Sequence, residues 1–99
     1  MNYNNAIKKT ILFIESHLTA SFTVEDAARE AGYSYYHLNR QFSAVLGESV
    51  GSYIKKRRLS HAARELIYTE RRIIDIALDH GFESSEAFSR AFKAVYHTR

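Results

Sequence analysis

The 99-residue sequence contains no cysteine, no proline and only four glycines. The lack of cysteine excludes disulfide bridges, thiolate nucleophiles and cysteine-based metal sites, so nothing in the sequence requires an oxidising compartment. The scarcity of glycine and proline argues against a sheet protein with many tight turns. The longest aliphatic and aromatic run covers only residues 11–14, which is too short for a membrane span or a signal peptide. We therefore expect an all-helical protein that is cytoplasmic and has no membrane partner.

The residues that are present suit one small globular domain with a basic segment. Hydrophobic residues make up 45% of the sequence and aromatic residues 13%, which is enough for a packed core at this length. The net charge of +3 is concentrated in residues 34–68, which carry six basic and two acidic residues, whereas residues 69–99 carry five of each. Such a basic segment favours a polyanionic partner, although basic faces also occur in proteins that bind no nucleic acid.

Capping residues, helix-ending glycines and the 3.6-residue spacing of apolar residues predict six helices. Their expected ranges are about 5–18, 24–31, 35–46, 50–68, 73–80 and 85–95. The apolar stripe of the first helix is expected to contain Ile7, Ile11, Leu12, Ile14 and Leu18, and that of the third Leu38, Phe42 and Val45. The stripes of the fourth and sixth helices include Leu59, Ala62, Leu66 and Ile67, and Phe88, Phe92 and Val95. These stripes should face the core.

The second and third helices are repeated by the fifth and sixth. Gly32 aligns with Gly81 at an offset of 49, and the helices that follow align at an offset of 50, so the second turn is one residue longer. The pairs matched at the second offset include Ser34 with Ser84, Leu38 with Phe88, Arg40 with Arg90 and Phe42 with Phe92. The repeat predicts two helix-turn-helix units, at 1–48 and 69–99, joined by a long linker helix at 49–68. Chance similarity between two amphipathic helix pairs is the alternative.

The second helix of a helix-turn-helix unit can enter the major groove of DNA while the first helix braces it. The candidates for base contact are therefore the outward-facing residues of the third and sixth helices, namely Tyr35, Tyr36, Asn39, Arg40, Ser85, Glu86, Ser89 and Arg90. The guanidinium of Arg40 matches guanine O6 and N7, the amide of Asn39 matches adenine N6 and N7, and the carboxylate of Glu86 can accept from cytosine N4. An ordinary solvated side chain is the alternative at each position.

A second group of candidates would contact DNA phosphates: Ser34, His37, Lys55, Arg58, Ser84 and Lys93. Backbone N–H groups beside capping serines favour an anion. Residues 55–58 are four consecutive bases, of which only some can face the DNA, because a helix turns about 100° per residue. For Arg57 and Arg58, pairing with an internal acid such as Glu65 or Asp75 is the alternative. A linker helix of about 19 residues would be roughly 28 Å long and would present the two recognition helices to successive major grooves.

Three stretches together resemble the DNA-binding domain of the AraC/XylS family of bacterial transcription regulators. They are FTVEDAAREAGYSYYHLNRQF, GESVGSYIKKRRLSHAARELI and IIDIALDHGFESSEAFSRAFK, and they extend over most of the chain. The resemblance implies a homeodomain-like fold of seven helices in two subdomains, base contacts from the eight residues named above, and a transcription activator whose partners are double-stranded DNA and RNA polymerase. The ending YHTR departs from the family pattern at His97. We therefore expect the seventh helix to be missing and any effector-binding domain of a longer parent to lie C-terminally.

No arrangement of residues in the sequence indicates an enzyme, a cofactor or a metal site. The five histidines, His17, His37, His61, His80 and His97, show none of the close spacings of a zinc site. There is also no phosphate-binding glycine loop and no serine–histidine–aspartate arrangement. DNA binding would associate the protein with the nucleoid. The alternative function is a helical protein-interaction module, in which the aromatic outer face of the third helix would bind a partner helix.

Overall fold

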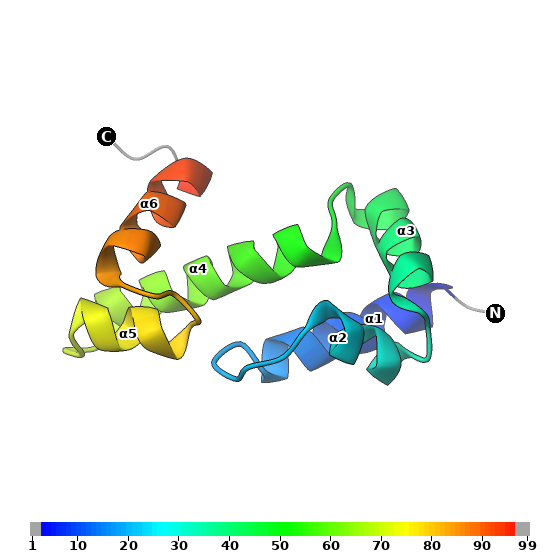
Figure 1. Ribbon diagram of the computed structural model, residues 1–99, viewed down its shortest axis with the longest axis horizontal. Helices are drawn as coiled ribbons and strands as arrows, with labels where there is room; N and C mark the ends of the chain where they lie inside the picture. The colour runs from blue at the N-terminus through cyan, green and yellow to red at the C-terminus, as the bar shows by residue number, and fades with distance from the viewer. Residues whose placement is uncertain (1–2, 97–99) are drawn as a thin grey trace. The chain divides into compact units, whose positions relative to one another are not determined.

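The computed structural model describes residues 3–96, and over that range the chain forms six helices and no strand (Figure 1). The helices are α1 (Tyr3–Ser16), α2 (Val24–Ala31), α3 (Tyr35–Leu46), α4 (Val50–Tyr68), α5 (Ile73–Asp79) and α6 (Ser85–Tyr96). The all-helical fold class is confirmed for this part of the chain, and the largest error in the predicted ranges is at the ends of α1, which finishes at Ser16 instead of Leu18. His97 and the missing seventh helix lie outside the described residues. None of the described helices is long and apolar enough to span a membrane.

The six helices belong to two compact units. The first unit reaches to Lys55, and the second continues from Lys56 and also includes the loop residues Leu18–Ala20. The helix α4 is continuous over 19 residues and contributes to both units. The boundaries 1–48, 49–68 and 69–99 stay predictions, because the contacts divide α4 between the units instead of separating it from them.

In the first unit, α1 packs against both α2 and α3. Its fully buried side chains include Ile14 of α1, Leu38 and Phe42 of α3, and Val50 of α4. The ring of Phe42 meets the ring of Tyr53 edge-on, with 5.3 Å between the centroids. The apolar core of this unit therefore extends from α1 through α3 to the first turn of α4, which fixes how α3 is supported.

The second unit is built around a smaller apolar cluster. Its buried members are Leu59 and Ala62 of α4, Ile76 and Ala77 of α5, and Phe88 of α6. Partly buried side chains that pack against this cluster are Phe82, Ala91, Phe92 and Val95. The inner face predicted for the sixth helix is therefore the face that packs, although Phe92 and Val95 are not fully covered.

The two helix turns have the same backbone hydrogen bonds. Gly32 and Gly81 have φ angles of +80° and +85°, in the left-handed region that residues with a Cβ rarely adopt. The N–H of the next residue then donates to a carbonyl five residues back: Tyr33 N–H to the Ala28 oxygen at 3.0 Å, and Phe82 N–H to the Ala77 oxygen at 2.9 Å. The repeat seen in the sequence is therefore also a repeat of turn geometry.

The helices after these turns also begin in the same way. The Ser34 hydroxyl accepts the His37 N–H at 3.2 Å, and the Ser84 hydroxyl accepts the Ala87 N–H at 3.0 Å. A serine in this position satisfies one of the N–H groups that the first turn of a helix leaves unpaired. The predicted capping role of both serines is confirmed by these two bonds.

The helices before the turns begin differently in the two units. At α2, the Thr23 hydroxyl accepts the Asp26 N–H at 3.1 Å while the Asp26 carboxylate accepts the Thr23 N–H at 2.9 Å, which is a capping box. The Thr23 N–H and the Arg29 guanidinium hold the pKa of Asp26 below its ordinary 3.8. The ionised Asp26 carboxylate therefore stabilises the fold at neutral pH, and this contribution is lost as the pH falls through the lowered pKa of Asp26. The corresponding residue before α5, Arg72, makes no side-chain capping bond.

Several apolar residues that the helical spacing placed inside are exposed instead. They are Leu12, Val45, Leu66 and Ile67, and the side chains of Val45 and Ile67 are 54% and 72% exposed. Val45 and Ile67 belong to the last turns of α3 and α4, beyond the residues of those helices that reach a core. Helical spacing identifies a common face, but it does not say how far along the helix that face is covered.

We expect Phe42→Ala to lower the free energy of unfolding by about 3–5 kcal/mol, because the ring is fully buried and its loss leaves a cavity. Val45→Ala on the same helix is the matched control, and its expected cost is below about 1 kcal/mol because the side chain is largely exposed. Urea unfolding of both variants measures the difference. Equal losses of stability in the two variants would contradict the finding that Phe42 is buried and Val45 is exposed.

Candidate nucleic-acid interface

Four of the predicted base-contact residues come together on the outer face of α3. Tyr35, Tyr36 and Arg40 are exposed and Asn39 is half-buried. With Ser43 and Ala44, these four side chains line one shallow surface hollow. The face opposite Leu38 and Phe42 is therefore accessible and lined by groups that can donate and accept hydrogen bonds.

The guanidinium of Arg40 lies against the ring of Tyr36. Its Cζ atom is 5.7 Å from the ring centroid, within the range of a cation–π interaction. Because Arg40 remains exposed, this contact restricts the orientation of the side chain without burying its donors. An arginine restrained in this way loses less conformational freedom on binding than a free side chain would.

Asn39 has a structural partner that the sequence analysis did not anticipate. Its Oδ1 atom accepts the backbone N–H of Val50, the first residue of α4, at 3.0 Å. Because an N–H can only donate, the amide oxygen must face Val50. Bidentate recognition of adenine needs this same oxygen as an acceptor. The structure therefore gives Asn39 a role in positioning α4 against α3.

The corresponding face of α6 is less uniform. Glu86 and Arg90 are exposed, whereas Ser85 and Ser89 are half-buried. A second hollow, which is mostly apolar, is lined by Ala63, Leu66, Ile67, Ile73, Phe88, Ser89, Phe92 and Lys93. Ser89 therefore borders apolar side chains of its own unit, while Glu86 and Arg90 keep the outward orientation that was predicted.

The predicted phosphate contacts differ in how exposed they are. Lys55, Lys93 and His37 are exposed, and the ring of His37 lies against that of Tyr33 with 5.9 Å between centroids. The hydroxyls of the two capping serines are occupied by backbone N–H groups, as described above. Within the basic run, Lys55 and Lys56 are exposed and the two arginines are half-buried, in agreement with the expectation that only some of the four face outward.

Arg58 makes internal contacts. Its Nε atom donates to the Leu18 carbonyl at 3.1 Å and its Nη2 atom to the Ala20 carbonyl at 2.8 Å. Burial lowers the pKa of this guanidinium from its ordinary value, because desolvation disfavours the charged form. Both of these acceptors are backbone carbonyls of the loop after α1. Glu65 and Asp75 pair with Arg71 and Arg72 instead.

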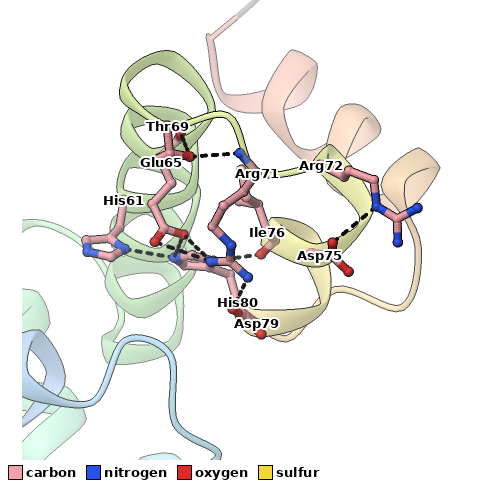
Figure 2. A network of polar contacts seen from close by, with 9 residues as sticks. All are labelled: His61, Glu65, Thr69, Arg71, Arg72, Asp75, Ile76, Asp79 and His80. Carbon is pink, nitrogen blue, oxygen red and sulfur yellow. Dashed lines mark hydrogen bonds and ion pairs between the residues drawn. The ribbon is translucent and has the colours of Figure 1, made fainter.

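The second unit contains a polar cluster that the sequence analysis missed (Figure 2). His61 and Glu65 lie one turn apart on α4, and His80 lies just after α5. The Nδ1 atom of His61 is 2.7 Å from Nε2 of His80, and Oε2 of Glu65 is 3.9 Å from the same nitrogen. The sequence analysis found no histidine at the spacing of a zinc site, but folding brings His61, Glu65 and His80 together. The four-residue spacing of His61 and Glu65 was a visible signal, but the approach of His80 depends on packing between α4 and α5.

Comparisons with known proteins agree with the helix-turn-helix arrangement of the helices. A family model described as a helix-turn-helix domain matches residues 27–99. The chain is 50% identical over 97 residues to the uncharacterized HTH-type transcriptional regulator YbfP of Bacillus subtilis (strain 168). This match covers 98% of this chain and 33% of YbfP. It is 40% identical over 96 residues to the regulatory protein SoxS of Escherichia coli (strain K12), which covers 97% of this chain and 90% of SoxS. The chain thus spans about a third of the length of YbfP but most of SoxS.

The fold is also similar to that of solved structures. A transcriptional regulator from Chromobacterium violaceum, described among AraC-type DNA-binding domain-containing proteins, superimposes with a TM-score of 0.91 at 25% identity. The superposition covers 96% of this chain and 85% of the other.

We expect Asn39→Ala to lower the free energy of unfolding by about 1–2 kcal/mol, because the buried end of α4 loses an acceptor for the Val50 N–H. Asn39→Asp retains an acceptor, and a carboxylate is favoured at a helix N-terminus, so this variant should keep most of the stability. Thermal unfolding of the two variants at neutral pH measures the effect. Wild-type stability of Asn39→Ala would mean that the amide does not hold α4.

Proposed function

The chain belongs to the AraC-type helix-turn-helix family of DNA-binding bacterial transcription regulators, and from this premise we propose that it reads double-stranded DNA through the outer faces of α3 and α6. The observation that carries the proposal is the exposed hollow on α3, where four polar or aromatic side chains follow a turn closed by Gly32. A recognition helix needs such an open face opposite the side that packs on its own unit.

The residues of α3 divide into two roles. Arg40 is the proposed guanine contact, because its fork of donors is exposed and oriented by Tyr36. Tyr35 and Tyr36 can pack on thymine methyl groups or on the sugar–phosphate backbone. Asn39 contributes chiefly by fixing α4 beneath this face, since its amide oxygen is occupied. In this proposal the first unit contributes more to base recognition than the second.

In the second unit, Arg90 and Glu86 are the proposed base contacts, with Ser85 and Ser89 at the edge of the same face. Arg90 repeats the position of Arg40 in the aligned units. Lys55, His37 and Lys93 are exposed and are the proposed phosphate contacts. The N–H groups at the starts of α3 and α6 add donors for phosphate. Recognition of successive major grooves by the two helices stays a prediction.

The location, regulatory role and partners of the protein are proposed from the family as a whole. We infer a cytoplasmic, nucleoid-associated activator that acts together with RNA polymerase, with no catalytic activity of its own. An effector-binding domain in a longer parent is part of the same proposal, because the chain spans about a third of the length of YbfP. A protein-interaction module without DNA binding is the less favoured function.

DNA affinity should fall steeply with salt. If the interface involves ~6–10 phosphate contacts, affinity for a selected site should drop about a thousandfold or more between 50 and 200 mM salt, because bound counterions are released. Fluorescence anisotropy with labelled duplexes, selected from a random pool, measures this slope. A salt-independent affinity would favour the protein-interaction module.

Two substitutions should affect DNA binding in different ways. Arg40→Ala is expected to reduce discrimination at one base pair by about 1–3 kcal/mol, because a bidentate base contact is lost. Lys55→Ala should weaken binding to all sequences alike and reduce the salt slope by about one. Titrations against single-base variants of the selected site separate the two effects. An unchanged base preference in Arg40→Ala would contradict its assignment as a base contact.

A further inference from the structure

The cluster of His61, Glu65 and His80 brings three metal-ligand groups together within the second unit. One donor atom from each residue lies within 4.8 Å of the other two, and no other group of this kind is found among residues 3–96. Figure 2 shows the two α4 side chains directed toward the ring of His80. The three residues are not part of either proposed DNA-reading face.

The ring of His80 is held in one orientation. Its side chain is fully buried, and its Nδ1 atom lies 2.7 Å from the carbonyl oxygen of Ile76. Because a carbonyl oxygen can only accept, Nδ1 carries a proton, and in the neutral ring the lone pair of Nε2 then faces His61 and Glu65. Metal-binding histidines are typically oriented in this way, with one ring nitrogen donating to a backbone carbonyl or carboxylate and the other free to coordinate.

The carboxylate of Glu65 is also held in place. The Nη1 atom of Arg71 donates to its two oxygens at 3.4 and 3.2 Å, and the Nη2 atom of Arg71 donates to Asp79. An arginine guanidinium is charged at neutral pH, and the hydrogen bond with Asp79 raises the pKa of Arg71 further. Ligating carboxylates in metal sites are likewise fixed by hydrogen bonds from outside the ligand shell.

The distance between the two imidazoles is close to what a zinc ion requires. Nδ1 of His61 lies 2.7 Å from Nε2 of His80, and with His80 neutral the His61 N–H is the donor. Two nitrogens bound at about 2.0–2.1 Å in a tetrahedral site lie roughly 3.3 Å apart. His61 is half-buried, and a retreat of its ring by roughly 0.6 Å, with the proton moved to Nε2, would open the position for the ion.

We propose that His61, Glu65 and His80 bind one zinc ion, with a water molecule in the fourth position. Two histidines and one glutamate are a ligand set that zinc accepts, whereas calcium and magnesium prefer oxygen ligands. The ion would join α4 to the end of α5, directly before the turn at Gly81. Zinc binding would therefore stabilise the first helix of the second helix-turn-helix, which lacks a side-chain cap at Arg72.

The test is zinc titration of the complete 99-residue chain after treatment with a chelator. Isothermal titration calorimetry should give one zinc per chain, and cobalt(II) should give the visible absorption of a tetrahedral site with nitrogen and oxygen ligands. Zinc should also raise the melting temperature, because it binds the folded state. Absence of stoichiometric binding would overturn the proposal and leave the cluster as a hydrogen-bond network.

Variants locate the bound ion. His61→Ala and Glu65→Gln should each weaken zinc binding at least about tenfold and abolish the zinc-dependent rise in melting temperature. Neither side chain is fully buried, so both variants should fold, whereas substitution of buried His80 could unfold the unit and is avoided. His17→Gln in the first unit is the matched control and should bind zinc like the wild type. Wild-type affinity of folded His61→Ala would place the ion elsewhere and contradict the assignment.

Discussion

Both helix-turn-helix units depend on a close approach between two helices. This approach requires a residue with left-handed backbone conformation in the turn. After Gly32 and Gly81, the chain reverses quickly enough for the next N–H to reach a carbonyl five residues back. Those carbonyls belong to Ala28 and Ala77, which are themselves buried, so small side chains allow the helices to meet. A Cβ at Gly81 would stand 3.4 Å from the guanidinium of Arg58. That distance is an ordinary van der Waals contact, so the backbone conformation, with φ of +85°, is what favours glycine in the second turn.

The other constraint on each unit is how it holds its part of α4. In the first unit, the amide of Asn39 accepts the Val50 N–H, and Phe42 packs on Tyr53. In the second, Arg58 satisfies the carbonyls of Leu18 and Ala20. Asn39 and Arg58 are residue types that contact DNA in many proteins, yet here each bonds to backbone groups of its own unit. The proposed contacts with DNA therefore fall to neighbouring side chains such as Arg40 and Lys55, which are exposed.

The sequence predicted the features that depend on neighbouring residues. Helix ranges and caps were predicted well, because Thr23, Ser34 and Ser84 bond to N–H groups only three residues away. The exposed face of α3 was also predicted, since helical spacing places Arg40 opposite the buried Leu38 and Phe42.

Features that depend on tertiary contacts were not predicted. Arg58 and its acceptor carbonyls are 38 and 40 residues apart, and His61 and His80 are 19 residues apart. No periodicity relates positions at such distances. Helical spacing likewise could not show that the last turns of α3 and α4, with Val45 and Ile67, extend past the cores they were expected to join.

The repeat in the sequence conceals a difference in how the two units are stabilised. In the first unit, α2 carries its own capping box, so its N-terminus is satisfied locally by Thr23 and Asp26. At the aligned position in unit two, Arg72 offers no acceptor, and Asp75 pairs with its side chain instead. The helix α5 has only seven residues, too few to be stable alone.

Contacts to α4 therefore have to replace the missing cap. Arg71 bridges Glu65 of α4 and Asp79 of α5, and His80 meets His61 at the other side of the same carboxylate. Because these polar groups hold a short helix that local sequence does not hold, their geometry must be well defined in the folded state. In the second unit these polar contacts, together with the buried Ile76 and Ala77, hold α5 against α4, whereas α2 in the first unit also has a local cap.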